Sequence, residues 1–158
     1  MLSAWVASWS AVYSNHALLR TVIEFAHVGG LVAGGGSALA ADLATVRAAA
    51  ASEAARATEL QLLRRTHPIV IVGLIAVFAS GLFLFAADVD TYLYSRVYWI
   101  KMALVVLLLI NGALLWHGER RVSRGEGEAW RVLHYTALAS VVLWLVITFA
   151  GAALPNIG

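Results

Sequence analysis

The sequence predicts an all-α integral membrane protein, a single bundle of four transmembrane helices with a short interfacial helix before it. Composition is the first observation, because 61% of the 158 residues are hydrophobic and only 13% are charged. The mean hydropathy of +0.82 is far above that of a soluble domain. The second observation is length, since a membrane crossing takes about 20 apolar residues and the chain has room for about four. One membrane domain therefore accounts for residues 1–158.

The first 18 residues predict a short helix lying at the level of the lipid headgroups. Trp5, Trp9 and Tyr13 recur at helical spacing with serines between them, as in an interfacial helix. A flexible tail with scattered aromatic residues is the alternative. No basic residue precedes Arg20, whereas a secretory signal begins with positive charge, so we interpret this segment as mature sequence.

Four apolar stretches predict the transmembrane spans: residues 20–42, 68–87, 97–116 and 132–153. The connection between the first two is rich in alanine, and Ser52 stands ahead of Glu53 as a helix N-cap, so both helices should extend past the membrane. Pro68 predicts a restart or a bend where the second helix enters the lipid. Pro155 predicts the end of the fourth helix.

Arginines predict the direction in which the spans cross. They gather in the first and third connections: Arg47, Arg56, Arg64 and Arg65, then Arg120, Arg121, Arg124 and Arg131. By the positive-inside rule both connections are cytoplasmic and both termini lie outside. We therefore expect a multi-pass protein of the bacterial inner membrane, surrounded by membrane lipids.

The first span has a flank with almost no side chains. Gly30, Gly34 and Ala38 stand four residues apart, and a parallel row of small residues begins at Gly29. Such a flank lets another helix, or a flat cofactor, approach the backbone closely. Packing against a helix is the commoner cause, and both interpretations stay open.

Three ionisable residues fall inside the predicted spans: Glu24, His27 and Lys101. An ionisable group in a span costs about 3 kcal/mol on insertion scales, so each needs a partner. Glu24 and His27 share a helix face, and Lys101 lies at a similar depth. In one interpretation Glu24 and Lys101 form an ion pair that fixes helix register. In the other, His27 is an axial ligand of a haem iron, and Lys101 is a second ligand or meets a propionate.

Three other histidines lie at the cytoplasmic ends of the spans: His67, His117 and His134. His117 is about 160 degrees from Lys101 around its helix, so it should face outward. We interpret the three as interfacial residues, with His134 the best candidate for a second cofactor site. Asn111, in the middle of the third span, should bond across to another helix, with close packing at Gly112.

Composition also excludes several classes of function. The chain has no cysteine, which excludes disulfides, iron-sulfur clusters and cysteine catalysis. Two methionines and no cysteine give little support for a copper path of soft ligands. The formal net charge of +2 forms no basic patch, so we expect no nucleic-acid partner.

Three segments resemble a loose superfamily of four-helix bacterial membrane proteins: EFAHVGGLVAGGG, HPIVIVGLIAVFASGLFLFAAD and YWIKMALVVLLLINGALL. The superfamily includes HemJ-type protoporphyrinogen oxidases, the membrane domains of CopD-type copper-resistance proteins and uncharacterised relatives. The resemblance to the HemJ type implies b-type haem held by His27 and by Lys101 in its Trp-x-Lys context. That family's Pro-Arg-Leu-Phe segment is replaced here by ALAADLATVR, so the resemblance supports haem binding more than it supports the oxidase activity.

We therefore expect a haem b protein of the membrane, used for electron transfer, with His27 and Lys101 as metal ligands. Glu24, Gly30, Gly34 and His134 complete the predicted cofactor-binding residues. The alternative is a non-enzymatic accessory subunit that packs against a larger membrane complex, or forms a homo-oligomer, through the glycine-rich helix. A proton-coupled carrier using the three ionisable groups ranks last. The sequence leaves enzymatic activity open.

Overall fold

A computed structural model describes residues 2–48 and 52–157, and in that part of the chain every regular element is a helix. The predicted all-α class is confirmed. The elements are α1 (Leu2–Asn15), α2 (Ala17–Gly30), η1 (Leu31–Gly35), α3 (Gly36–Ala48), α4 (Glu53–Ala87), α5 (Val89–Tyr94), α6 (Arg96–Ser123) and α7 (Ala129–Ile157). The element η1 is a short π-helical stretch between α2 and α3.

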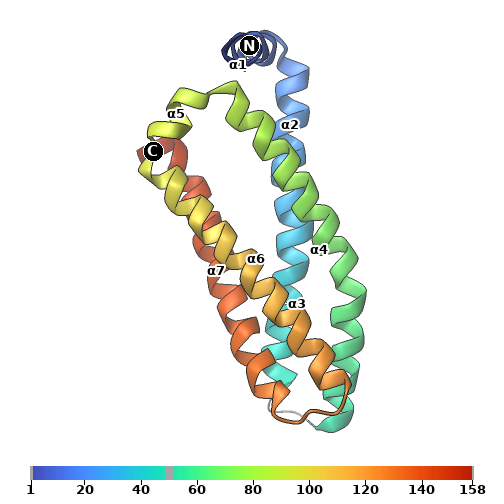
Figure 1. The fold of residues 1–158 in the computed structure, drawn as a ribbon. Coiled ribbons are helices and arrows are strands. Elements are labelled where there is room, and N and C mark those ends of the chain that lie inside the picture. Colours follow the sequence, from blue (N-terminus) through green and yellow to red (C-terminus); the bar gives the residue numbers. More distant parts are fainter. Residues whose placement is uncertain (1, 49–51, 158) are drawn as a thin grey trace.

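Four helical stretches of the described chain are long and apolar enough to cross a membrane: Ala17–Ala48, Glu53–Ala87, Arg96–Ser123 and Ala129–Leu154. Each contains one of the predicted spans and extends beyond it. Figure 1 shows α2, η1 and α3 as one continuous rod beside α4, with α6 and α7 as a second pair. The chain is therefore a multi-pass membrane protein.

The two ends of the bundle differ. Both marked termini lie at the same end, where α1 packs on α4 and α2 and where α5 joins α4 to α6 (Figure 1). We name it the termini end. The end of α3, the start of α4 and the α6–α7 connection lie at the opposite end, named here the arginine-rich end for the arginines in these segments.

Local signals set several helix boundaries. The Ser52 hydroxyl accepts a hydrogen bond from the Ala55 amide at 3.4 Å, which confirms the predicted N-cap of α4. Helix α4 then runs without a restart through Pro68. The expected stop at Pro155 is wrong, because α7 continues to Ile157. A proline removes one backbone N–H, but the residues after it can keep helical dihedral angles.

The turn from α6 to α7 needs a glycine. Gly125 has φ of 84 degrees, in the left-handed region that side chains disfavour. Its amide donates to the Val122 carbonyl at 2.9 Å, and the Glu126 amide donates to the Arg121 carbonyl at 3.3 Å. These two bonds form a Schellman motif, which ends α6 and reverses the chain.

Two clusters of buried apolar side chains hold the helices together. The first lies toward the arginine-rich end: Ala41, Leu63, Leu115, Val122, Ala129, Leu133 and Ala137. The second lies nearer the middle: Ala38, Leu108, Trp144 and Ile147. Helix α7 packs against both α6 and α3, while α2 and η1 pack on α4. Toward the termini end, the α2/α4 and α6/α7 pairs diverge (Figure 1).

Candidate functional site

The intramembrane histidine contacts a serine of the neighbouring helix. His27 Nδ1 lies 3.0 Å from Ser80 Oγ, which joins α2 to α4. Ser80 is buried, with 4% of its surface exposed, and the imidazole packs over Gly81. A β-carbon on Gly81 would lie 3.4 Å from His27 Cε1, so a larger residue there would press on the ring. The bond and this close packing together fix the ring against α4.

The serine also determines which ring nitrogen carries the proton. Ser80 Oγ donates to the Ala76 carbonyl at 2.5 Å, with the Val77 carbonyl at 3.2 Å. Because a hydroxyl has one proton and this one is directed at a backbone carbonyl, the oxygen accepts from His27 Nδ1–H. The proton therefore sits on Nδ1, and Nε2 of the neutral ring keeps its lone pair.

Lys101 lies at the same level of the bundle, on α6. Its Nζ would be 3.6 Å from a β-carbon on Gly151, so the lysine extends across the face of α7 where a glycine makes room. The side chain is partly buried. Among the described residues, no hydrogen bond or ion pair to Lys101 Nζ is found.

Glu24 does not join this pair. It is exposed, and its Oε1 accepts a hydrogen bond from the Tyr13 hydroxyl of α1 at 3.0 Å. Burial, together with the Glu24 carboxylate, raises the pKa of Tyr13 to about 12. The expected ion pair with Lys101 is absent from the described residues. The reason is positional, because α1 packs on α2 and α4 and brings Tyr13 to Glu24.

The glycine flank of the first span is filled by α4. A β-carbon on Gly30 would lie 2.9 Å from the Gly73 carbonyl oxygen, and one on Gly34 would lie 2.9 Å from Gly73 Cα. The next glycine meets α7 instead, because a β-carbon on Gly35 would lie 2.9 Å from the Trp144 ring. Helix packing thus explains Gly30, Gly34 and Gly35, because backbone or ring atoms of α4 and α7 occupy the places where their β-carbons would lie.

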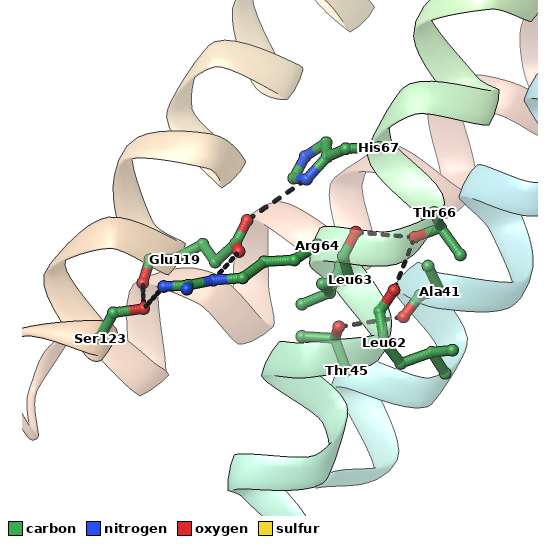
Figure 2. Close-up of polar contacts among 9 residues, drawn as sticks. All are labelled: Ala41, Thr45, Leu62, Leu63, Arg64, Thr66, His67, Glu119 and Ser123. Atoms are coloured by element: carbon green, nitrogen blue, oxygen red, sulfur yellow. Dashed lines mark hydrogen bonds and ion pairs between the residues drawn. The ribbon is translucent and has the colours of Figure 1, made fainter.

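A second polar cluster joins α4 to α6 near the arginine-rich end. Figure 2 shows Arg64 and His67 of α4 converging on Glu119 of α6. Arg64 Nε donates to Glu119 Oε1 at 3.3 Å, and Arg64 Nη2 donates to Ser123 Oγ at 2.8 Å. His67 Nδ1 lies 3.5 Å from Glu119 Oε2, a contact whose geometry does not make a hydrogen bond. Glu119 is only 3% exposed, so Arg64 neutralises a buried carboxylate.

The remaining predicted residues are spread over the bundle. His117 is exposed, as its helical phase predicted, whereas His67 contacts Glu119. His134 lies near the start of α7, far along the bundle from His27. Asn111 Nδ2 donates to the Thr136 carbonyl at 2.9 Å, which confirms the predicted bond to another helix. The close packing expected at Gly112 is wrong, since a β-carbon there would meet nothing within 4 Å.

Sequence reasoning missed Ser80 and Glu119, although a signal for each was present. Glu119 continues the buried stripe of α6 formed by Leu108, Asn111, Leu115 and Val122. Ser80 stands two turns after Gly73 on the face of α4 that meets α2. In both cases the small or apolar residues on one face of the helix indicate that this face is buried. A polar residue on the same face is then expected to be buried too.

Among the described residues, no three His, Asp or Glu side chains are grouped to hold a metal ion. The fold and the site define a multi-pass, all-α membrane protein with paired polar residues between its helices. Comparisons with protein-family models, with curated proteins and with solved structures found no match.

Proposed function

We propose that the chain binds b-type haem through His27, with Lys101 as second ligand or as the partner of a propionate, and serves in electron transfer. The observation that carries the proposal is the bond between His27 Nδ1 and Ser80. Histidines that ligate metals donate their other ring N–H to a neighbouring acceptor, which orients the ring and leaves Nε2 for the metal. His27 has this arrangement, with Ser80 Oγ as the acceptor.

Lys101 adds support from the opposite helix pair. A partly buried amine without a partner among the described residues is costly in a membrane, and a propionate or an iron would satisfy it. Since α4 occupies the sides of Gly30 and Gly34, we place the macrocycle between His27 of α2 and Lys101 of α6 instead. Gly30, Gly34, Glu24 and His134 are not part of the site we propose.

A bound haem would supply a one-electron redox centre. Ser80 would hold the His27 ring in one tautomer, and the apolar cluster below it, which includes Leu108 and Trp144, would exclude water. By the positive-inside rule the site would lie in the outer half of the bacterial inner membrane, with both termini outside. The resemblance to HemJ-type proteins, which rests on the His27 and Lys101 motifs, agrees with this assignment.

The test is an absorption spectrum of the full chain, as purified and after haem addition, oxidised and then reduced with dithionite. We expect a Soret band that shifts on reduction, its loss in His27→Ala and an altered spectrum in Lys101→Met. His117→Ala is the matched control, because His117 is exposed on the outside of α6. A wild-type chain that takes up no haem would reject the proposal, as would a His27→Ala spectrum identical to wild type.

An accessory subunit remains the second candidate, and one surface favours it. An apolar groove of about 490 Å³ runs between α2 and α4, with Gly29, Ala33, Ile69 and Val72 in its lining. A transmembrane helix of a partner would pack there through small residues. Gly29→Leu and Ala33→Leu are the suitable tests, because Gly34→Leu would disrupt packing within the chain itself. Loss of a co-purifying membrane protein in these variants, but not in His27→Ala, would favour this function.

A further inference from the structure

A pocket of about 460 Å³ opens at the arginine-rich end, between the end of α3 and the starts of α4 and α7. Its lining includes Arg56 of α4 and Arg131, His134 and Tyr135 of α7. None of the described residues that line it is an aspartate or a glutamate. The pocket therefore combines two guanidinium groups with no acidic side chain.

The position of Arg56 is fixed by its neighbours. Its Nε donates to the Ala48 carbonyl at 3.4 Å, and its guanidinium carbon lies 5.4 Å from the centre of the Trp130 ring. A cation over an aromatic face is attracted by the ring quadrupole, which keeps the guanidinium in this position. Arg56 is thus an anchored positive charge at one side of the pocket.

His134 contributes a hydrogen-bond donor. Its Nδ1 is buried without a hydrogen-bond partner, and its ring packs edge-on against Tyr135 at 5.5 Å between centroids. A buried N–H without an acceptor is rarer in proteins than a buried lone pair without a donor. The proton of the neutral ring therefore belongs on Nε2, the nitrogen left to face the pocket.

The neighbouring turn has two acidic residues: Glu128 is exposed and lies outside the pocket lining, and Glu126 is paired. Glu126 Oε2 accepts from Arg121 Nε at 2.7 Å, on the α6 side of the turn. Arg131, on the first turns of α7, is exposed at the pocket. Arg131 and His134 consequently offer donors to a pocket that also carries the charge of Arg56, and the group that matches them is an anion with several acceptor oxygens.

We propose that this pocket binds a phosphate group, and specifically the headgroup phosphate of an anionic phospholipid. Basic pockets between helices at the end of membrane spans take such headgroups, and Trp130 and Tyr135 are residues typical of the headgroup level. The proposal does not depend on haem at His27, because the two sites lie toward opposite ends of the bundle (Figure 1).

The test measures the unfolding temperature of the full chain in mild detergent against added short-chain phosphatidylglycerol, short-chain phosphatidylcholine or inorganic phosphate. We expect phosphatidylglycerol to raise the unfolding temperature at concentrations where phosphatidylcholine does not change it. Arg131→Gln should weaken the apparent affinity on the order of fivefold, and Arg131→Lys should restore most of it. Arg124→Gln is the matched control, because Arg124 is exposed at the end of α6, outside the pocket lining, and its loss changes the net charge equally.

Equal weakening in Arg124→Gln and Arg131→Gln would overturn the proposal, because it would show attraction to surface charge alone. Equal stabilisation by phosphatidylcholine would also overturn it. Stabilisation by inorganic phosphate that is lost in Arg131→Gln would support the phosphate site and assign it to a free anion. Should Arg131→Gln not fold, His134→Phe keeps the ring and removes the donor, and it should lower the affinity for phosphatidylglycerol in the same assay.

Discussion

Gly34 and Gly73 bring two membrane helices into backbone contact. A β-carbon on Gly73 would lie 2.5 Å from Gly34 Cα and 2.8 Å from the Gly30 carbonyl oxygen. Real β-carbons do not approach so closely, so the crossing of α2–η1 with α4 requires glycine at these positions. The atoms in the way belong to the backbone and cannot rotate aside.

Gly73→Ala should therefore destabilise the protein. The added methyl group forces the helices apart, and we expect a cost of about 1–3 kcal/mol in the free energy of unfolding. Gly112→Ala is the control, since a β-carbon there meets nothing within 4 Å. The measurement is unfolding in mixed micelles, followed by circular dichroism. A cost for Gly73→Ala no larger than for Gly112→Ala would contradict the close crossing.

The Arg64–Glu119 pair should contribute more to the stability of the fold than the other arginine–glutamate pair of the described chain. Arg64→Ala leaves the Glu119 carboxylate buried without its charge partner, whereas Glu119→Gln removes the buried negative charge itself. We expect Arg64→Ala to lower the free energy of unfolding more than Glu119→Gln does. The double variant should be more stable than Arg64→Ala alone. Arg121–Glu126, each side chain 41% exposed, is the control and should contribute less than about 1 kcal/mol. A double-mutant cycle on each pair measures the difference, and similar coupling energies would refute this ranking.

How much the sequence predicts depends on whether a feature is local. The four spans follow from composition, and the Ser52 cap follows from the residues of one helical turn. The Asn111 bond follows from the need of a buried amide for a partner. The structure confirms all three predictions. The partner of Glu24 could not be predicted, because it depends on how α1 packs on α2 and α4. The π-helical stretch Leu31–Gly35 changes which glycine faces which helix, and no periodicity reveals it.

The same limit applies to the candidate site. Intramembrane His27 and Lys101 stand out by the cost of burying them, but their neighbours come from other helices. Ser80 and Gly151 become visible only when α4 and α7 are in place. The glycine flank was ambiguous for this reason, because a neighbouring helix and a flat cofactor both require small residues where they approach the backbone.

The Tyr13–Glu24 hydrogen bond predicts a loss of stability in alkali. Tyr13 has a pKa of about 12 in the folded chain, above its ordinary value of 10. The stabilisation is therefore complete below about pH 10 and is lost as the pH rises through about 12. We expect the melting temperature of wild type to approach that of Tyr13→Phe between these values. Tyr94→Phe, an exposed tyrosine of α5, is the control, and a constant difference between wild type and Tyr13→Phe would count against the bond.

Ser80→Ala should disturb His27 even when no haem is present. Without the hydroxyl, Nδ1–H loses its acceptor, so the proton redistributes between the two ring nitrogens. In wild type, ¹⁵N NMR of labelled histidine should show His27 protonated at Nδ1, and the Ser80→Ala spectrum should show a mixture of tautomers. Loss of this support should also weaken haem binding about 10–100-fold. Thr148→Ala is the control, because the hydrogen bond of the Thr148 hydroxyl lies within α7, to the Trp144 carbonyl. An unchanged tautomer in Ser80→Ala would show that Ser80 does not orient the ring, and the geometric basis of the haem site would fail with it.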